Sequence, residues 1–406
     1  MKKAKHVRML LALFLLADIG TGIALFLRRD TLPGWEPSEY ISAAAQIGTR
    51  DEILRAAEAC RDLYIGAEKL PPEYYGGDQR LRQADIDAIE ERLAAAGFAT
   101  LDSDEIYPTY LENPEELQGF WEAVSDGENA VTTVIRVSEH GGFQHLLFSW
   151  QDGKAFYVLT DLGWDAENGI YVREAETRPI YDMELADWGI FYYQIYPEDP
   201  HYINYSQIRM EAVDRERYDM TRKYILSVGY QFTNLFLCDW QEGAWGKLSF
   251  NDLFEFLYEQ NTGEVLDSGQ FSYQQGPTRA IIPAALFEET ILPWFAISTE
   301  EFRTLSQYDA ERDCYLWRPR FGEDVTAWKY PMCEPQVTDW TQNSDGTLTM
   351  TVQVYSPDLK TDSLFTHQVT VRPLENGKFQ YAANRVTNVS DRGLPPSMPR
   401  FELDGP

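Results

Sequence analysis

The period of the apolar positions changes along this chain, and it predicts helices first and strands later. Thr49 and Glu52 match the pattern that caps the N-terminus of a helix, and apolar residues recur behind them at helical spacing. Two more amphipathic helices are expected at residues 86–96 and 113–124, the second with Asn113 as its cap. Each of these helices needs a partner on which to bury its apolar face.

In the next part of the chain, apolar and polar residues alternate, which is the period of a half-buried strand. The runs at 131–137, 143–150 and 155–160 are predicted strands, and Asp152 with Gly153 predicts a tight hairpin turn between the last two. Later runs of the same kind lie at residues 170–173, 188–196, 205–213 and 234–240. We therefore expect an antiparallel sheet with the helices packed on it.

Further helices follow, and after a linker the order of helices and then strands repeats on a smaller scale. Asp214 is expected to begin a helix over 214–228, and Gly263 to end a helix over 249–263. The segment 266–277 is rich in Gln, Ser and Gly and is the expected linker. Helical stretches at 284–295 and 299–307 follow, and then a regular alternation at 347–355 flanked by hairpin turns at Asp345-Gly346 and Asn376-Gly377.

The predicted fold class is α+β, with helices packed on antiparallel sheets in two domains. We assign residues 1–30 to an N-terminal membrane anchor or signal segment, 31–270 to a helix-rich α+β domain, 276–395 to a smaller α+β domain with a β-meander, and 396–406 to a tail. Two helices laid on a curved antiparallel sheet would make the smaller domain cystatin-like or NTF2-like.

The first 30 residues differ from the rest of the chain. A basic cluster precedes an apolar run from Met9 to Leu27, interrupted by Asp18, which is about as long as a helix that spans a bilayer. A cleaved secretory signal has a shorter apolar stretch, so we prefer a single-pass anchor, with cleavage and secretion as the alternative. The basic cluster favours a cytoplasmic N-terminus and an extracytoplasmic body.

Charge narrows the choice of partners. The chain has 65 Asp and Glu against 35 Lys and Arg, a net charge of −30. Six basic and two acidic residues lie in the first 30, so the rest of the chain has a net charge of −34. Such a body repels phosphate backbones, and we expect no nucleic-acid partner. Cations or cationic surfaces are the favoured electrostatic partners.

No motif for catalysis or metal binding stands out. The four cysteines form no C-x-x-C pair, and no G-x-S-x-G elbow occurs. We therefore expect no metal and no cofactor. His367 alternates in phase with apolar neighbours, which is typical of a hydrogen-bonded core or edge histidine rather than a catalytic one. Cys314 and Cys333 are close enough in sequence for a disulfide in an oxidising compartment, a bond that we leave open.

The aromatic residues supply the candidate binding site. The chain has 11 Trp and 24 Tyr, and exposed rings stack on sugars or partner surfaces. Tyr230, Trp240 and Trp245 flank a glycine-containing turn together with Asp239, and these four residues are the candidate cluster. The alternative, which the usual burial of aromatic residues favours, is that the rings fill the seam between helix and sheet.

Several segments resemble a known family. The stretch Asn234–Trp240, followed by Leu248–Phe254, resembles a family of uncharacterised membrane-anchored or secreted proteins of Gram-positive bacteria, classed only as a domain of unknown function. The helix at Phe287–Ile291 and the strand at Gly377–Tyr381 are similar to the same family. The resemblance implies no activity and supplies no catalytic residue.

Together these features predict an extracytoplasmic envelope protein with a non-enzymatic binding ectodomain, whose partner is a surface protein or a glycan. The alternative is a cell-wall or polysaccharide hydrolase that uses paired carboxylates across a cleft. With 65 acidic residues, the sequence does not select such a pair. The absence of a catalytic His, Cys or Ser arrangement in the sequence favours the binding protein.

Overall fold

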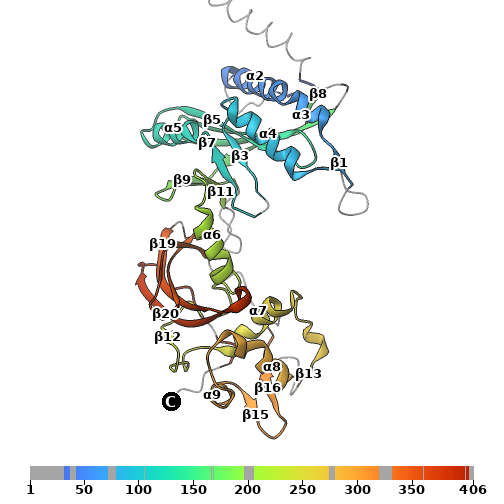
Figure 1. Ribbon diagram of the computed structural model, residues 1–406. Coiled ribbons are helices and arrows are strands. Elements are labelled where there is room, and N and C mark those ends of the chain that lie inside the picture. Colours follow the sequence, from blue (N-terminus) through green and yellow to red (C-terminus); the bar gives the residue numbers. More distant parts are fainter. Residues whose placement is uncertain are drawn as a thin grey trace, which may run out of the picture. The chain divides into compact units, whose positions relative to one another are not determined.

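The computed structural model describes most of the chain (Figure 1). The described residues are 32–36, 43–71, 79–104, 106–165, 167, 169–195, 205–273, 279–319, 332–359, 361–397 and 399–401. The fold is mixed α+β, as predicted, and it divides into two compact units. Unit 1 comprises Met1–Asp199 and Asn204–Ala212, and unit 2 comprises Pro200–Ile203 and Val213–Pro406.

The predicted membrane segment, residues 1–30, lies outside the described residues. Within the part of the chain that is described, no helix is both long and apolar enough to cross a membrane. The anchor therefore stays a prediction from the sequence.

A six-stranded sheet with the order β4-β3-β5-β6-β7-β8 forms the centre of unit 1. Its long strands pair antiparallel in chain order, and they are β5 (Ala130–Val137), β6 (Phe143–Gln151), β7 (Lys154–Asp165) and β8 (Gly169–Ile180). The three strands predicted between residues 131 and 160 are confirmed. Asp152 and Gly153 both have positive φ between β6 and β7, as the predicted hairpin turn requires.

One pairing departs from the antiparallel pattern. The short strand β3 (Thr100–Asp102) pairs antiparallel with β4 (Tyr110–Glu112) but parallel with β5. The chain passes through helix α5 (Glu115–Ser125) between β4 and β5, which allows it to return to the sheet in the same direction as β3. A separate antiparallel sheet contains β9 (Asp182–Ala186), β10 (Ile190–Gln194) and β11 (Tyr205–Arg209).

The helices of unit 1 bury their apolar faces against the six-stranded sheet in two places. Helices α2 (Ala43–Ala59), α3 (Arg61–Gly66) and α4 (Gln83–Ala95) form one core with Phe143 and Leu162 of the sheet. Helix α5 forms a second core, in which Leu117 and Phe120 pack with Phe148, Phe191 and Tyr193. A short hairpin of β1 (Lys69–Leu70) and β2 (Arg80–Leu81) precedes α4.

Two predicted helix caps have other roles. Helix α2 begins before Thr49, whose hydroxyl donates to the Ala45 carbonyl within the helix at 2.9 Å, so the predicted start at Thr49 is wrong. Asn113, expected to cap α5, has a φ of 56°, and its amide donates to the carbonyls of Ala94 and Phe98 at the end of α4. It therefore satisfies the C-terminus of the preceding helix rather than the N-terminus of its own.

Unit 2 contains two antiparallel sheets, with the orders β12-β20-β19-β18-β17 and β13-β14-β16-β15. The first is the predicted meander, formed by β17 (Glu334–Gln342), β18 (Leu348–Ser356), β19 (Thr361–Pro373) and β20 (Phe379–Val389). Four register shifts interrupt its ladders. Such bulges bend and twist the strands, and Figure 1 shows this sheet strongly curved. The second contains β13 (Ser272–Tyr273), β14 (Ala280–Pro283), β15 (Tyr308–Asp309) and β16 (Cys314–Trp317).

The helices of unit 2 agree in part with the predicted pattern. Helix α6 (Arg215–Thr221) is capped by Asp214, which accepts from the Arg217 amide, and it continues as the π-helix η2 (Arg222–Leu226). Helix α7 (Phe250–Thr262) ends at Gly263 with a φ of 72°. The predicted start of a helix at Asp214 and the predicted end of a helix at Gly263 are confirmed. Helix α8 (Ala284–Ile291), the 3₁₀ turn η4 (Leu292–Trp294) and helix α9 (Thr299–Leu305) follow.

The strand predicted at 234–240 is wrong except at its end, where Trp240 and Gln241 form β12. The residues before Trp240 form turns. The side chain of Asn234 explains the missing strand. It donates to the Lys247 carbonyl at 2.6 Å and accepts from the Ser249 amide. An Asn side chain that bonds nearby backbone in this way competes with a strand ladder.

A single core extends through unit 2, across the segment expected to be a linker. Residues 268–270 form the 3₁₀ turn η3, and Phe271 packs on Trp317 with ring centroids 6.2 Å apart. Phe254 and Phe287, from opposite sides of the segment, stack at 4.6 Å. The structure therefore groups the chain differently from the expected domains 31–270 and 276–395, since its division falls near residues 199–213.

The described part of the C-terminal segment is fixed to unit 2 by Arg400. Its guanidinium donates to Asp252 at 2.8 Å and to Glu255 at 2.5 Å, both on α7, and to the Arg318 carbonyl at 3.0 Å. The Asp252 side chain is only 3% exposed. Residues 399–401 are thus part of the folded unit. Elsewhere in unit 2, Cys314 and Cys333 are not joined by the disulfide that the sequence left open.

Candidate functional site

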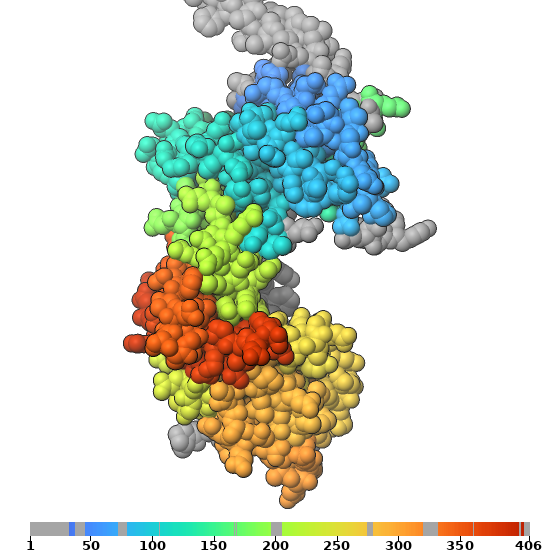
Figure 2. Space-filling view, viewed as in Figure 1, coloured from blue at the N-terminus to red at the C-terminus, as the bar shows by residue number. Residues whose placement is uncertain are grey.

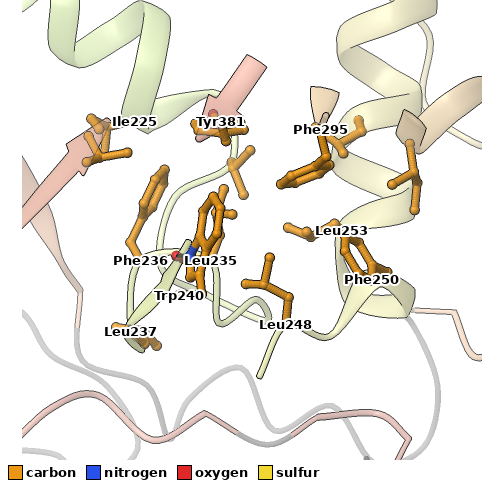
Figure 3. Close-up of a cluster of buried hydrophobic side chains, with 14 of the residues drawn as sticks. Ile225, Leu235, Phe236, Leu237, Trp240, Leu248, Phe250, Leu253, Phe295 and Tyr381 are labelled. Carbon is orange, nitrogen blue, oxygen red and sulfur yellow. Dashed lines mark hydrogen bonds between the residues drawn. The ribbon is translucent and has the colours of Figure 1, made fainter. Parts of the chain in front are cut away.

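The three aromatic residues of the sequence-predicted cluster lie in the core of unit 2. Tyr230, Trp240 and Trp245 are 4%, 4% and 2% exposed. Trp240 and Trp245 stack with centroids 5.5 Å apart, and the Trp240 indole donates to the Leu235 carbonyl at 2.7 Å. Figure 3 shows Trp240 enclosed by apolar side chains. In the structure these rings are not accessible to a ligand, and they fill the space between helix and sheet.

The remaining contacts of the cluster are structural. The Asp239 carboxylate accepts a hydrogen bond from the Val386 amide on β20 at 2.8 Å. The Tyr230 hydroxyl bonds a different partner, His367 Nε2, at 2.8 Å. His367 Nδ1 lies 2.7 Å from Asn384 Oδ1, and Asn384 Nδ2 donates to the Cys238 carbonyl. The Asn384 oxygen must therefore accept, which places the imidazole proton on Nδ1. Burial lowers the pKa of His367 to about 4, so the ring is neutral at pH 7.

An open hollow elsewhere on unit 2 has the features expected of a ligand site. Its volume is about 330 Å³, within the range of small-molecule sites. Among the described residues, three cationic side chains, three uncharged polar side chains and two aromatic rings line it, and no acidic side chain does. The lining residues are Arg222, Lys223, Ser227, Gln260, Asn261, Pro293, Trp294, Gly377, Lys378 and Phe379. We call this the cationic hollow.

Four segments distant in sequence meet at the cationic hollow. They are the π-helix η2, the end of α7, the turn η4 and the start of β20. In Figure 1 the red turn before β20 lies beside the end of α6 and beside α7, and Figure 2 shows their surfaces adjoining. Sequence reasoning missed this site because no single segment carries its pattern.

The π-helix brings Arg222 and Lys223 to the hollow. Thr221, just before it, donates its hydroxyl to the Arg217 carbonyl at 2.8 Å and accepts from the Val337 amide of β17 at 2.9 Å. A hydroxyl that bonds the helix backbone in this way disturbs the regular ladder, and π-helical turns occur frequently at functional sites. Lys223 Nζ lies 5.0 Å from the centroid of the Tyr224 ring.

The half-buried ring of Trp294 is held in a fixed orientation at the hollow. Its Nε1 donates to Asn261 Oδ1 at 3.0 Å, and Asn261 Nδ2 donates in turn to the Thr290 carbonyl. The ring packs edge-on against Phe379 at 5.2 Å and lies 6.3 Å from Tyr381. The indole N–H is therefore already satisfied, and the part of the ring that faces the hollow is an apolar surface.

Lys378 follows an Asn-Gly turn at the edge of the hollow. Asn376 and Gly377 have φ values of 60° and 75°, which is the conformation predicted from the Asn-Gly pair. Among the residues that the structure describes, neither Lys378 nor Lys223 has a carboxylate partner, whereas Arg222 lies 3.8 Å from Asp219 on the exposed surface. Two of the three cations are thus available to an anionic group.

Unit 1 has a second hollow, of about 350 Å³, whose charged lining is acidic. Glu90, Asp102 and Glu112 line it, and the Tyr110 hydroxyl lies 2.7 Å from Glu112 and 3.3 Å from Asp102. Burial raises the pKa of Glu90 to about 7. Both oxygens of its carboxylate accept from Ser103, at 2.5 and 3.1 Å. In the described part of the chain, no three His, Cys, Asp or Glu side chains gather to hold a metal ion.

Comparison with known proteins identifies the family. No curated protein and no solved structure matches this chain. A family of unknown function, DUF6070, matches residues 47–400, which includes nearly all of both units. The chain therefore belongs to the DUF6070 family.

Proposed function

We propose that this chain is a non-enzymatic binding protein and that the cationic hollow of unit 2 is where its ligand binds. In this proposal the N-terminal segment is a single-pass membrane anchor, the folded body is extracytoplasmic, and the protein belongs to the envelope of a Gram-positive bacterium. Cleavage of the segment would instead release a secreted form. Residues 276–395, which share one core with the preceding segments of unit 2, would form its cystatin-like or NTF2-like part.

The observation that carries the proposal is the makeup of the cationic hollow. A fixed tryptophan ring, amide side chains and cations converge there from four segments of the chain. An aromatic surface beside a few placed polar groups is the usual arrangement of a small-molecule or glycan site. The candidate cluster at Tyr230 and Trp240 lacks such an opening, since those rings are buried.

A hydrolase is the second candidate, and the acidic hollow of unit 1 is the observation that favours it. A carboxyl group with a raised pKa beside other carboxylates resembles the general acid of a glycosidase. However, Glu90 is only 4% exposed and both of its oxygens bond Ser103, so its carboxyl is not free to transfer a proton to a substrate. Binding at the cationic hollow is therefore the better supported function.

A thermal-shift screen of the full-length chain against neutral and acidic oligosaccharides tests the proposal. A ligand at one hundred times its Kd stabilises a folded protein by about 2.7 kcal/mol, so we expect the Tm to rise by several degrees. Trp294→Ala should remove the shift. Trp340→Ala is the matched control, because Trp340 is an exposed tryptophan of β17 outside the hollow.

The same mixtures, assayed for new reducing ends, test the hydrolase. Glycan cleavage that persists in Trp294→Ala and disappears in Asp102→Asn would favour the acidic hollow instead. A shift that Trp294→Ala leaves unchanged would contradict binding at the cationic hollow.

A further inference from the structure

We infer that the ligand of the cationic hollow is a negatively charged saccharide, one that carries carboxylate or phosphate groups on its sugar rings. This inference rests on the proposed function, because it names the class of ligand that the hollow binds. It also departs from the expectation, based on net charge alone, that the partners of this chain are cationic.

The charge of the hollow is opposite to that of the chain. Acidic residues outnumber basic ones by 65 to 35 in the sequence, yet every charged side chain that lines the hollow in the described part of the chain is basic. At physiological ionic strength, charges more than about 8 Å apart are largely screened. The cations beside a bound ligand therefore determine its charge preference at the site, more than the distant acidic surface does.

The availability of these cations points to a ligand rather than to a structural role. A lysine that stabilises a fold through charge forms an ion pair with a carboxylate. Among the described residues neither Lys223 nor Lys378 forms such a pair, and the Asp219 carboxylate lies 3.8 Å from Arg222 instead. Both lysines are exposed residues on different segments, one on η2 and one before β20. Arg222 adds a planar guanidinium, which suits carboxylate and phosphate oxygens.

The aromatic part of the hollow favours a sugar over a free anion. Trp294 presents an apolar ring surface, and its N–H is already bonded to Asn261. Such a surface packs against the apolar face of a sugar ring, whereas a free phosphate or sulfate gains nothing from it. Ser227 and Gln260 supply hydroxyl and amide groups that suit sugar hydroxyls. A volume of about 330 Å³ accommodates one or two rings of a longer chain.

A nucleic acid fits the same cations less well. Binding of a phosphate backbone needs several positive contacts along an extended surface, and the hollow offers three cations on a chain of net charge −30. The cations line one hollow of about 330 Å³ rather than an extended surface, which suits a short acidic saccharide.

Isothermal titration of the full-length chain with three matched probes tests the inference. The probes are trigalacturonate, its neutral methyl ester and phosphorylated maltotriose. We expect at least one charged probe to bind, the ester to bind roughly tenfold or more weakly, and the affinity to fall as salt is added. Binding of only one of the two charged probes identifies carboxylate or phosphate as the group recognised.

Charge variants provide the matched comparison. Lys223→Gln combined with Lys378→Gln should raise the Kd for the charged probe roughly tenfold or more, because charge-assisted hydrogen bonds are the stronger kind. Lys247→Gln combined with Arg385→Gln removes the same charge from exposed positions of unit 2 outside the hollow and should leave the Kd unchanged. The Tm of each variant without ligand shows that it folds.

Two results would overturn the inference, and they separate it from the proposed function. If the methyl ester binds as tightly as trigalacturonate and Trp294→Ala abolishes both, the hollow binds sugars without selecting charge, so the inference fails and the proposed function stands. If no saccharide, charged or neutral, binds the wild-type chain, both fail.

Discussion

At the scale of single residues, one group of polar side chains buried in the core of unit 2 is matched pair by pair. His367 accepts from the Tyr230 hydroxyl and donates to Asn384, which itself donates to the Cys238 carbonyl. A buried polar group without a partner costs roughly 1–3 kcal/mol, so this chain of hydrogen bonds accounts for a polar side chain that is 0% exposed. The period of the sequence predicted a core histidine here, and the structure confirms it.

The neutral state of His367 makes the stability of unit 2 depend on pH. Its pKa is about 4 in the folded chain, against 6.5 when unperturbed. Between these values the unfolded state binds more protons, so stability is fully present above pH 6.5 and is lost as the pH falls towards 4. At 1.36 kcal/mol per pKa unit, we expect a loss of about 3 kcal/mol.

Urea denaturation of the wild type and of His367→Gln between pH 4 and 7 measures this loss. The variant should show a flatter dependence over that range, because it lacks the titrating group. His140→Gln, which removes an exposed histidine of unit 1, should follow the wild type. Parallel curves for the wild type and His367→Gln would contradict the prediction.

At the scale of elements, prediction succeeded where one local pattern determines the structure. The strands between residues 130 and 165 and the turn at Asp152-Gly153 follow from alternation and turn chemistry alone. It failed where a side chain bonds a segment distant in sequence. Asn113 looks like the cap of its own helix, but its amide bonds the end of α4. The cationic hollow was not predicted from the sequence for the same reason, because it forms only where four segments meet.

Arg400 illustrates a contact between distant segments that unit 2 depends on. Removing it leaves the Asp252 carboxylate buried without its guanidinium partner, and breaking a buried ion pair of this kind costs about 3–5 kcal/mol. We therefore expect Arg400→Ala to lower the free energy of unfolding of unit 2 by that amount, measured by chemical denaturation. Arg400→Lys should restore only part of it, since a lysine cannot reproduce the forked contacts to Asp252 and Glu255.

The matched control is Arg392→Ala, at an exposed arginine of the same C-terminal segment. Its effect should stay within about 0.5 kcal/mol. An Arg400→Ala variant that behaves like Arg392→Ala would show that the ion pair does not hold residues 399–401 in place.

At the scale of the whole molecule, the order of predicted helices and strands indicated correctly that the chain is α+β, but composition gave no way to place the division between its parts. Glutamine, serine and glycine made residues 266–277 look like a linker. Phe271 in that segment packs on Trp317, and the aromatic rings on its two sides share one core. A polar composition shows that a segment need not be buried, but it does not show that the flanking segments fold apart.

The division near residues 199–213 can be tested with fragments. Residues 213–406 contain the whole core of unit 2, so we expect them to unfold cooperatively on heating. Residues 276–406 lack α7 and β12. Phe287 and Trp317 then lose their ring contacts with Phe254, and Tyr381 loses its contact with Phe236. We therefore expect this fragment to show no cooperative transition. Calorimetry of both distinguishes the two boundaries, since a sharp transition in residues 276–406 would restore the linker at 266–277 as a true domain boundary.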